Sequence, residues 1–114
     1  TGARLALGSD WPVSSGTPLE GIAIGVSRRT ADGVPAGGWT PQEILPIGRA
    51  LSAYTAGVAY QAYAENTWGA ITPGASADLV WLERDPRATP ALELPDITVR
   101  ATYLRGRPAY LASN

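Results

Sequence analysis

The chain has 114 residues with a hydrophobic fraction of 45%, enough to bury one modest core, and it contains neither cysteine nor histidine. The absence of these two residue types excludes a disulfide, a thiol nucleophile and Ser–His catalysis within the chain. A net charge of −1 without a basic block argues against nucleic-acid and membrane partners. The sequence has no apolar run long enough to span a membrane and no signal-peptide pattern, so we expect a cytoplasmic protein.

The first predicted element is a short buried strand at residues 3–8. This apolar run is bounded by glycine, a pattern typical of a strand covered on both faces in a parallel sheet. It is followed by Ser9, Asp10 and Trp11 and then a proline, so a carboxylate stands at the tip of an apolar strand. An aspartate in this position is often only a turn residue or a helix cap, and these residues alone favour that interpretation.

Helical patterns occupy the middle of the chain. Residues 18–29 place apolar side chains at i, i+3, i+4 and i+7, although two glycines weaken this helix by about 1 kcal/mol each. Residues 30–39 are rich in glycine and proline and are predicted to be a loop. Thr40, followed by proline and by glutamate three residues on, is a helix-start signal. A further helix is expected over 46–64, kinked or divided at Gly57.

The C-terminal half is predicted to be antiparallel β-structure with one face exposed to water. A Thr-Pro-Gly turn at 72–74 precedes an apolar strand at 77–82. Residues 97–104 alternate between apolar and polar side chains. Arg-Gly at 105–106 suits a tight hairpin into a last strand at 108–111.

Four segments carry a resemblance to a known family. They are RLALGSDWPV (4–13), ALSAYTAGVAY (50–60), WGAITPGASADLVWLERDP (68–86) and TVRATYLRGRPAY (98–110). In this order and spacing they resemble the C-terminal end of a metal-dependent hydrolase of the amidohydrolase superfamily, in its amidohydrolase 3 branch. The resemblance implies an α/β parent enzyme, a (β/α)8 barrel joined to a small β-sandwich. This chain would then be a mixed α+β fragment with the last barrel strand, two or three helices and antiparallel C-terminal strands.

The resemblance also implies a division of the chain and a chemistry. Residues 1–64 would be the end of the barrel, and residues 65–114 the C-terminal part of the β-sandwich. Such enzymes hydrolyse C–N or related bonds of small molecules with one or two divalent metals, commonly zinc. Asp10 would follow the eighth barrel strand, contact the metal and take the proton of the metal-bound water. Ser9 and Trp11 would flank the substrate pocket, although shaping the loop is the simpler role for both.

One departure from the family pattern limits what this chain can do alone. The family's other ligands include histidines and a lysine, and the chain contains neither residue type. Since a catalytic zinc takes three or more protein ligands, we expect the chain alone to hold no metal and to be inactive.

Two functional hypotheses therefore stay open. The chain is the C-terminal part of an amidohydrolase, supplying Asp10 to a site completed by residues outside it, or it is a non-catalytic α+β module that binds a partner or self-associates. On the first hypothesis the missing barrel and sandwich neighbours leave strand edges unpaired, so we expect the isolated chain to self-associate, whereas a monodisperse monomer that melts cooperatively would favour the second.

Overall fold

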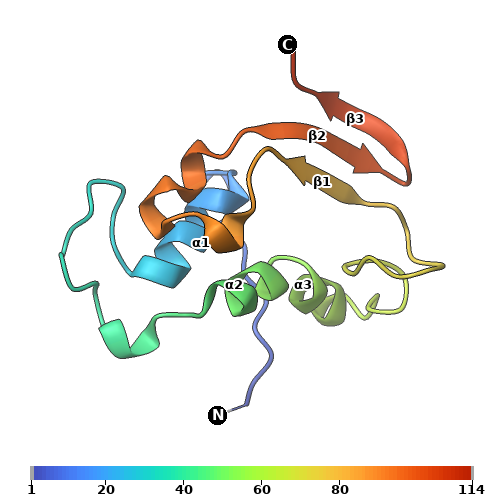
Figure 1. Cartoon of the computed structure of the whole chain (residues 1–114). Helices are drawn as coiled ribbons and strands as arrows, with labels where there is room; N and C mark the ends of the chain where they lie inside the picture. Colours follow the sequence, from blue (N-terminus) through green and yellow to red (C-terminus); the bar gives the residue numbers. More distant parts are fainter. Residues whose placement is uncertain (1, 114) are drawn as a thin grey trace.

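The computed structural model describes residues 2–113 as a mixed α+β arrangement, in which helices lie beside and below a small antiparallel sheet (Figure 1). None of the helices within these residues is long and apolar enough to cross a membrane. In chain order the helices and strands are α1 (Pro18–Ser27), the 3-10 helix η1 (Pro41–Glu43), α2 (Ile47–Ala53), α3 (Ala56–Gln61), β1 (Leu79–Leu82), the 3-10 helices η2 (Pro86–Ala88) and η3 (Ala91–Asp96), β2 (Val99–Leu104) and β3 (Arg107–Leu111).

Helix α1 confirms the helix predicted over 18–29, and it forms the centre of the core. It begins with proline at its first position and ends at Arg28, whose left-handed backbone (φ 55°) donates its N–H to the Ile24 carbonyl at 2.7 Å. Its apolar face buries Leu19 and Ile22 against η3, where Leu94 is fully buried. Figure 1 shows η3, in orange, against α1, so segments about 70 residues apart in sequence share one core.

The helix-start signal at Thr40 opens a single 3-10 turn, η1, but the Thr40 side chain does not cap it. Thr40 has a left-handed backbone (φ 48°) and makes no side-chain cap to η1. Its hydroxyl instead accepts a hydrogen bond from the Arg28 guanidinium at 2.9 Å. The cap side chain is therefore used in a tertiary contact to the end of α1, which local sequence could not show.

The helix predicted over 46–64 is divided, but not at Gly57. It breaks at Tyr54 and Thr55, where Thr55 leaves the helical region (φ −125°, ψ −92°). The Thr55 hydroxyl bonds the Leu51 carbonyl at 2.9 Å, a local bond that competes with the helical ladder. Gly57 lies inside α3 as its second residue.

The sheet has the order β1-β2-β3 and confirms the predicted antiparallel C-terminal strands. The expectation that only one face is exposed to water is wrong, because side chains on both faces of β1 and β3 are exposed. Arg105 and Gly106 both have positive φ (51° and 77°), as a two-residue hairpin turn of type I′ requires. The turn is anchored from the preceding segment, because the Asp78 carboxylate accepts the Arg105 N–H at 2.7 Å and the Ala77 carbonyl accepts the Gly106 N–H at 2.9 Å.

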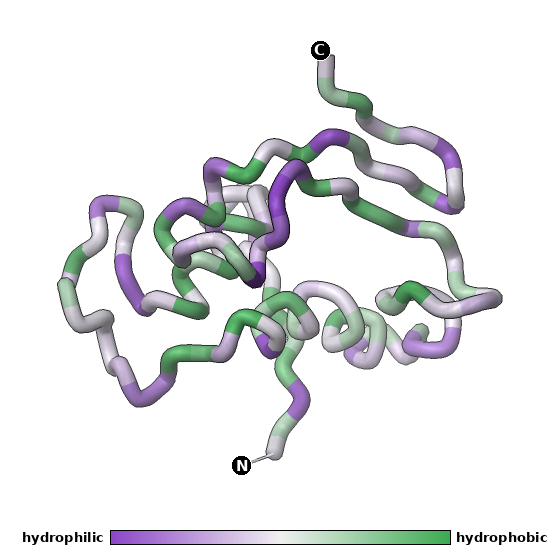
Figure 2. Tube along the Cα trace, in the orientation of Figure 1, coloured by the Kyte–Doolittle hydropathy of each residue, from purple (hydrophilic) through white to green (hydrophobic). Residues whose placement is uncertain are grey.

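β1 is an exposed apolar edge strand. Figure 2 shows it as a hydrophobic stretch, and Trp81 and Val80, which point to opposite faces, are 62% and 56% exposed. Its outer edge has no strand partner within residues 2–113. Such an edge favours pairing with a further strand, and self-association stays a prediction.

The strand predicted at residues 3–8 is absent from the described structure. No strand partner lies beside this segment within residues 2–113, and a parallel strand forms only when neighbouring strands supply its hydrogen bonds. The division into 1–64 and 65–114 and the barrel of the parent enzyme stay predictions, since they concern a longer protein.

Candidate functional site at the Asp10 loop

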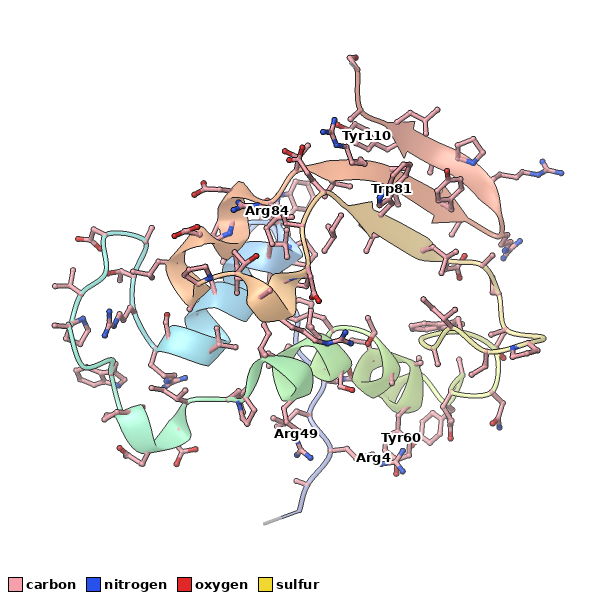
Figure 3. The ribbon with its side chains drawn as sticks, in the orientation of Figure 1. Arg4, Arg49, Tyr60, Trp81, Arg84 and Tyr110 are labelled. Carbon is pink, nitrogen blue, oxygen red and sulfur yellow. The ribbon has the colours of Figure 1, made fainter. Side chains whose placement is uncertain are left out.

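The segment that leads to Asp10 is held against α2 and α3. The Leu7 N–H donates to the Ala53 carbonyl at 3.0 Å. The Arg4 guanidinium lies 4.1 Å from the centre of the Tyr60 ring, a cation–π contact that Figure 3 shows beside the N-terminal segment. Gly57 permits the close approach, because a Cβ there would overlap the Leu5 carbonyl oxygen. These contacts fix the base of the Asp10 loop.

Asp10 stands exposed at the tip of this loop in a left-handed backbone conformation (φ 50°). Aspartate is one of the few residue types with a Cβ that adopt this conformation readily. The Val13 N–H donates to the Asp10 carbonyl at 2.8 Å, and the Ser14 hydroxyl donates to the Ser9 carbonyl at 2.5 Å. The loop therefore presents the carboxylate to solvent while its backbone groups bond within the loop.

Trp11, the second predicted neighbour of Asp10, packs on the end of the same loop. Its side chain is 72% exposed. A Cβ at Gly16 would lie 3.3 Å from Trp11 Cδ1, so the indole lies close against Gly16.

A hollow of about 510 Å³ opens beside the loop. Ser9 lines it, whereas Asp10 and Trp11 do not, so the three predicted site residues are neighbours in sequence but do not converge on this hollow. Its other lining groups include both signs of charge and several hydroxyls: Ser14, Ser15, Glu20, Arg28, Glu43 and Tyr54.

Tyr54, from the segment ALSAYTAGVAY, lines the hollow although it was not among the predicted site residues. Burial raises the pKa of its phenol above the ordinary value, so the hydroxyl stays protonated near neutral pH. It lies over α1, where a Cβ at Gly21 would overlap the hydroxyl oxygen. The glycine at this helical position was the only sequence signal, because it marks where another group approaches the helix closely.

The comparisons with known proteins place the chain in a family. The model of the amidohydrolase family matches residues 1–110, and the chain belongs to this family. Similar curated proteins are an amidohydrolase named YtcJ from Bacillus subtilis (32% identical over 96% of this chain), the protein LONG AFTER FAR-RED 3 from Arabidopsis thaliana (35% over 95%) and an N-substituted formamide deformylase from Arthrobacter pascens (33% over 92%). The chain spans 21%, 18% and 19% of their respective lengths, about a fifth in each case. The comparison with solved structures gave no match.

Members of this family generally use a divalent metal, and the donor set of this chain does not fit one by itself. Residues 2–113 hold no group of three or more His, Cys, Asp or Glu side chains arranged to bind a metal. Asp10 offers one exposed carboxylate, whereas a catalytic metal takes three or more protein ligands.

Proposed function

We propose that the chain is the C-terminal portion of a hydrolase that cleaves C–N bonds of a small molecule, with Asp10 as the acceptor of the attacking water's proton. The observation that carries the proposal is the family match, which includes the Asp10 loop. The Asp10 carboxylate is exposed on this loop, and the backbone of the loop is held by its own hydrogen bonds. The formamide deformylase relative supports the bond type, because its name describes a reaction at an N-substituted formamide.

Asp10 is suited to this role by its position and exposure. A carboxylate within hydrogen-bond reach of the attacking water can take its proton and pass it to the leaving nitrogen. A divalent metal, zinc in our proposal, would lower the pKa of its bound water toward about 7. Asp10 would be one contact to this metal, and the other ligands would come from outside this chain. Ser9 and Trp11, which flank the acid, are proposed to border the substrate.

The test uses the full-length protein that contains this chain, assayed on N-substituted formamides and simple amides. Asp10→Asn keeps the size of the side chain but removes its capacity to accept a proton, so kcat is expected to fall about 10²–10⁴-fold. Asp32→Asn is the matched control, because Asp32 is also an exposed loop aspartate but lies in the 30–39 loop, outside the loop that presents Asp10.

The competing interpretation treats Asp10 as a purely structural turn residue. It predicts that Asp10→Ala lowers the unfolding free energy by about 1 kcal/mol and leaves activity intact. Metal content is measured alongside kcat and the melting temperature. An Asp10→Asn variant that keeps its metal and hydrolyses substrate within a few-fold of wild type contradicts the proposal.

A further inference from the structure

We propose that Ser14 is a positioning residue that sets the direction of the Asp10 carboxylate through the backbone. The proposal rests on the proposed function of Asp10 and adds a second residue to it. Ser14 does not need to touch the substrate, because its hydroxyl acts on the peptide group that precedes Asp10.

Two peptide planes lie on either side of the Asp10 Cα, and each carries a hydrogen-bonded carbonyl. The plane before it contains the Ser9 carbonyl, which accepts the Ser14 hydroxyl at 2.5 Å. The plane after it contains the Asp10 carbonyl, which accepts the Val13 N–H at 2.8 Å. Because φ and ψ are rotations relative to these two planes, the two hydrogen bonds together restrain both backbone angles of Asp10.

The residue type of Asp10 does not by itself hold the present conformation. Aspartate tolerates the left-handed region in which its φ of 50° lies, but negative φ angles are open to it as well. A return to negative φ would swing the Cα–Cβ bond and carry the carboxylate away from its present direction. Loss of either hydrogen bond removes one restraint against this rotation.

Among residues 2–113, Ser14 is the only residue whose side chain forms a hydrogen bond with the Ser9 or Asp10 carbonyl. The neighbouring Ser15 hydroxyl accepts the Thr17 N–H at 3.2 Å and so bonds toward the start of α1 instead. Position 12 is proline, which has no N–H to offer to the loop. Removing the Ser14 hydroxyl therefore leaves the Ser9 carbonyl without its partner in the loop.

The size of the expected effect follows from how steeply catalysis depends on placement. A displacement of roughly 1 Å at a reacting group can lower a rate about 10²-fold. Ser14 is exposed, and one exposed hydrogen bond contributes little to global stability. A large change in kcat with a small change in melting temperature is thus expected when this bond is lost.

The experiment compares Ser14→Ala, Ser14→Thr and Asp10→Asn in the full-length enzyme. We expect Ser14→Ala to lower kcat about 10–100-fold with KM within a few-fold of wild type, and Ser14→Thr, which keeps the hydroxyl, to restore most of the rate. Deuterium exchange of the peptide covering residues 9–16 should be faster in Ser14→Ala than in wild type. In Ser14→Thr the exchange rate should return to the wild-type value. This second readout does not depend on activity or on bound metal.

Thr89→Ala is the matched control, since the Thr89 hydroxyl bonds the Asp85 carbonyl at 2.9 Å in a different loop. It should keep full activity and normal exchange in residues 9–16.

The outcomes separate this inference from the proposed function. If Asp10→Asn loses activity but Ser14→Ala keeps the wild-type kcat and exchange, the positioning role of Ser14 is overturned and the proposed function stands. If Ser14→Ala raises KM and leaves kcat unchanged, Ser14 contacts the substrate and the inference is likewise wrong. If Asp10→Asn retains activity, the proposed function itself fails.

Discussion

Replacing Gly57 by alanine is expected to destabilise the chain, although the same change inside a helix is usually stabilising. A Cβ at Gly57 would overlap the Leu5 carbonyl oxygen and lie 3.1 Å from the Leu5 carbonyl carbon and 3.2 Å from the Ser52 carbonyl oxygen. All three are backbone atoms, which cannot rotate aside as the end of a side chain can. The segment before Asp10 must therefore move away from α3.

The magnitude follows from two opposing contributions. Alanine favours a helix over glycine by about 0.8–1 kcal/mol. Forcing an extra carbon into a filled contact costs about 1–3 kcal/mol. Because the overlap is with backbone on the partner segment, we place the cost in the upper part of that range and expect a net loss of about 1–2 kcal/mol.

Gly48→Ala is a closely matched control. Gly48 is the second residue of α2, as Gly57 is of α3, and a Cβ at Gly48 would meet no atom within 4 Å. Gly48→Ala should therefore raise the unfolding free energy by about 0.5–1 kcal/mol. The two substitutions have the same chemistry and opposite expected signs.

The assay is urea unfolding of the purified chain, followed by circular dichroism at one fixed protein concentration. The difference in midpoint between the two variants gives the sign directly. If Gly57→Ala proves as stable as Gly48→Ala, Leu5 does not pack on α3. The reasoning that α2 and α3 hold the base of the Asp10 loop is then refuted.

Two further predictions concern the core and the sheet. Leu94→Ala should lower the unfolding free energy by about 2–5 kcal/mol, because Leu94 of η3 is fully buried against α1. Leu92 is 39% exposed, so Leu92→Ala should lower the unfolding free energy much less in the same urea titration. A hydrogen bond from the Thr98 side chain and the charge of Arg100 hold the pKa of Glu83 below its ordinary value. The ionised Glu83 side chain therefore stabilises the fold at pH values above the ordinary pKa of glutamate, and this stabilisation is lost as the pH falls through the lowered pKa. Unfolding midpoints measured from about pH 6 to about pH 3 should therefore fall less steeply in Glu83→Gln than in wild type, and equal slopes would contradict this assignment.

The C-terminal hairpin could be predicted because its determinants lie within a few residues of one another. The alternating run at 97–104 indicates an extended strand, and Arg105-Gly106 accepts the positive φ angles that the tight turn requires. α1 was predictable for the same reason, since its apolar spacing and its proline at the first position are local signals.

Three of the errors have a related cause, because groups distant in sequence, present or missing, decided the local conformation. Thr40 has the sequence of a helix cap, but its hydroxyl is bonded to Arg28. Residues 3–8 have the sequence of a buried strand, but the described chain supplies no strand beside them, and the Leu7 N–H bonds α2 instead. Tyr54 resembles an ordinary helix residue, yet its place over Gly21 depends on the packing of α2 against α1.

The candidate site shows both kinds of determinant acting on one side chain. The turn at Asp10 could be predicted from the sequence, because a small polar residue after an apolar run is a local signal for a turn. Its placement could not, because the base of the loop is held by α2 and α3, about 45 residues further along the chain. The tip is held separately by its own hydrogen bonds, including the one from Ser14. A change at the base should therefore move the loop as a unit, whereas a change at the tip should turn the carboxylate and leave the loop where it is.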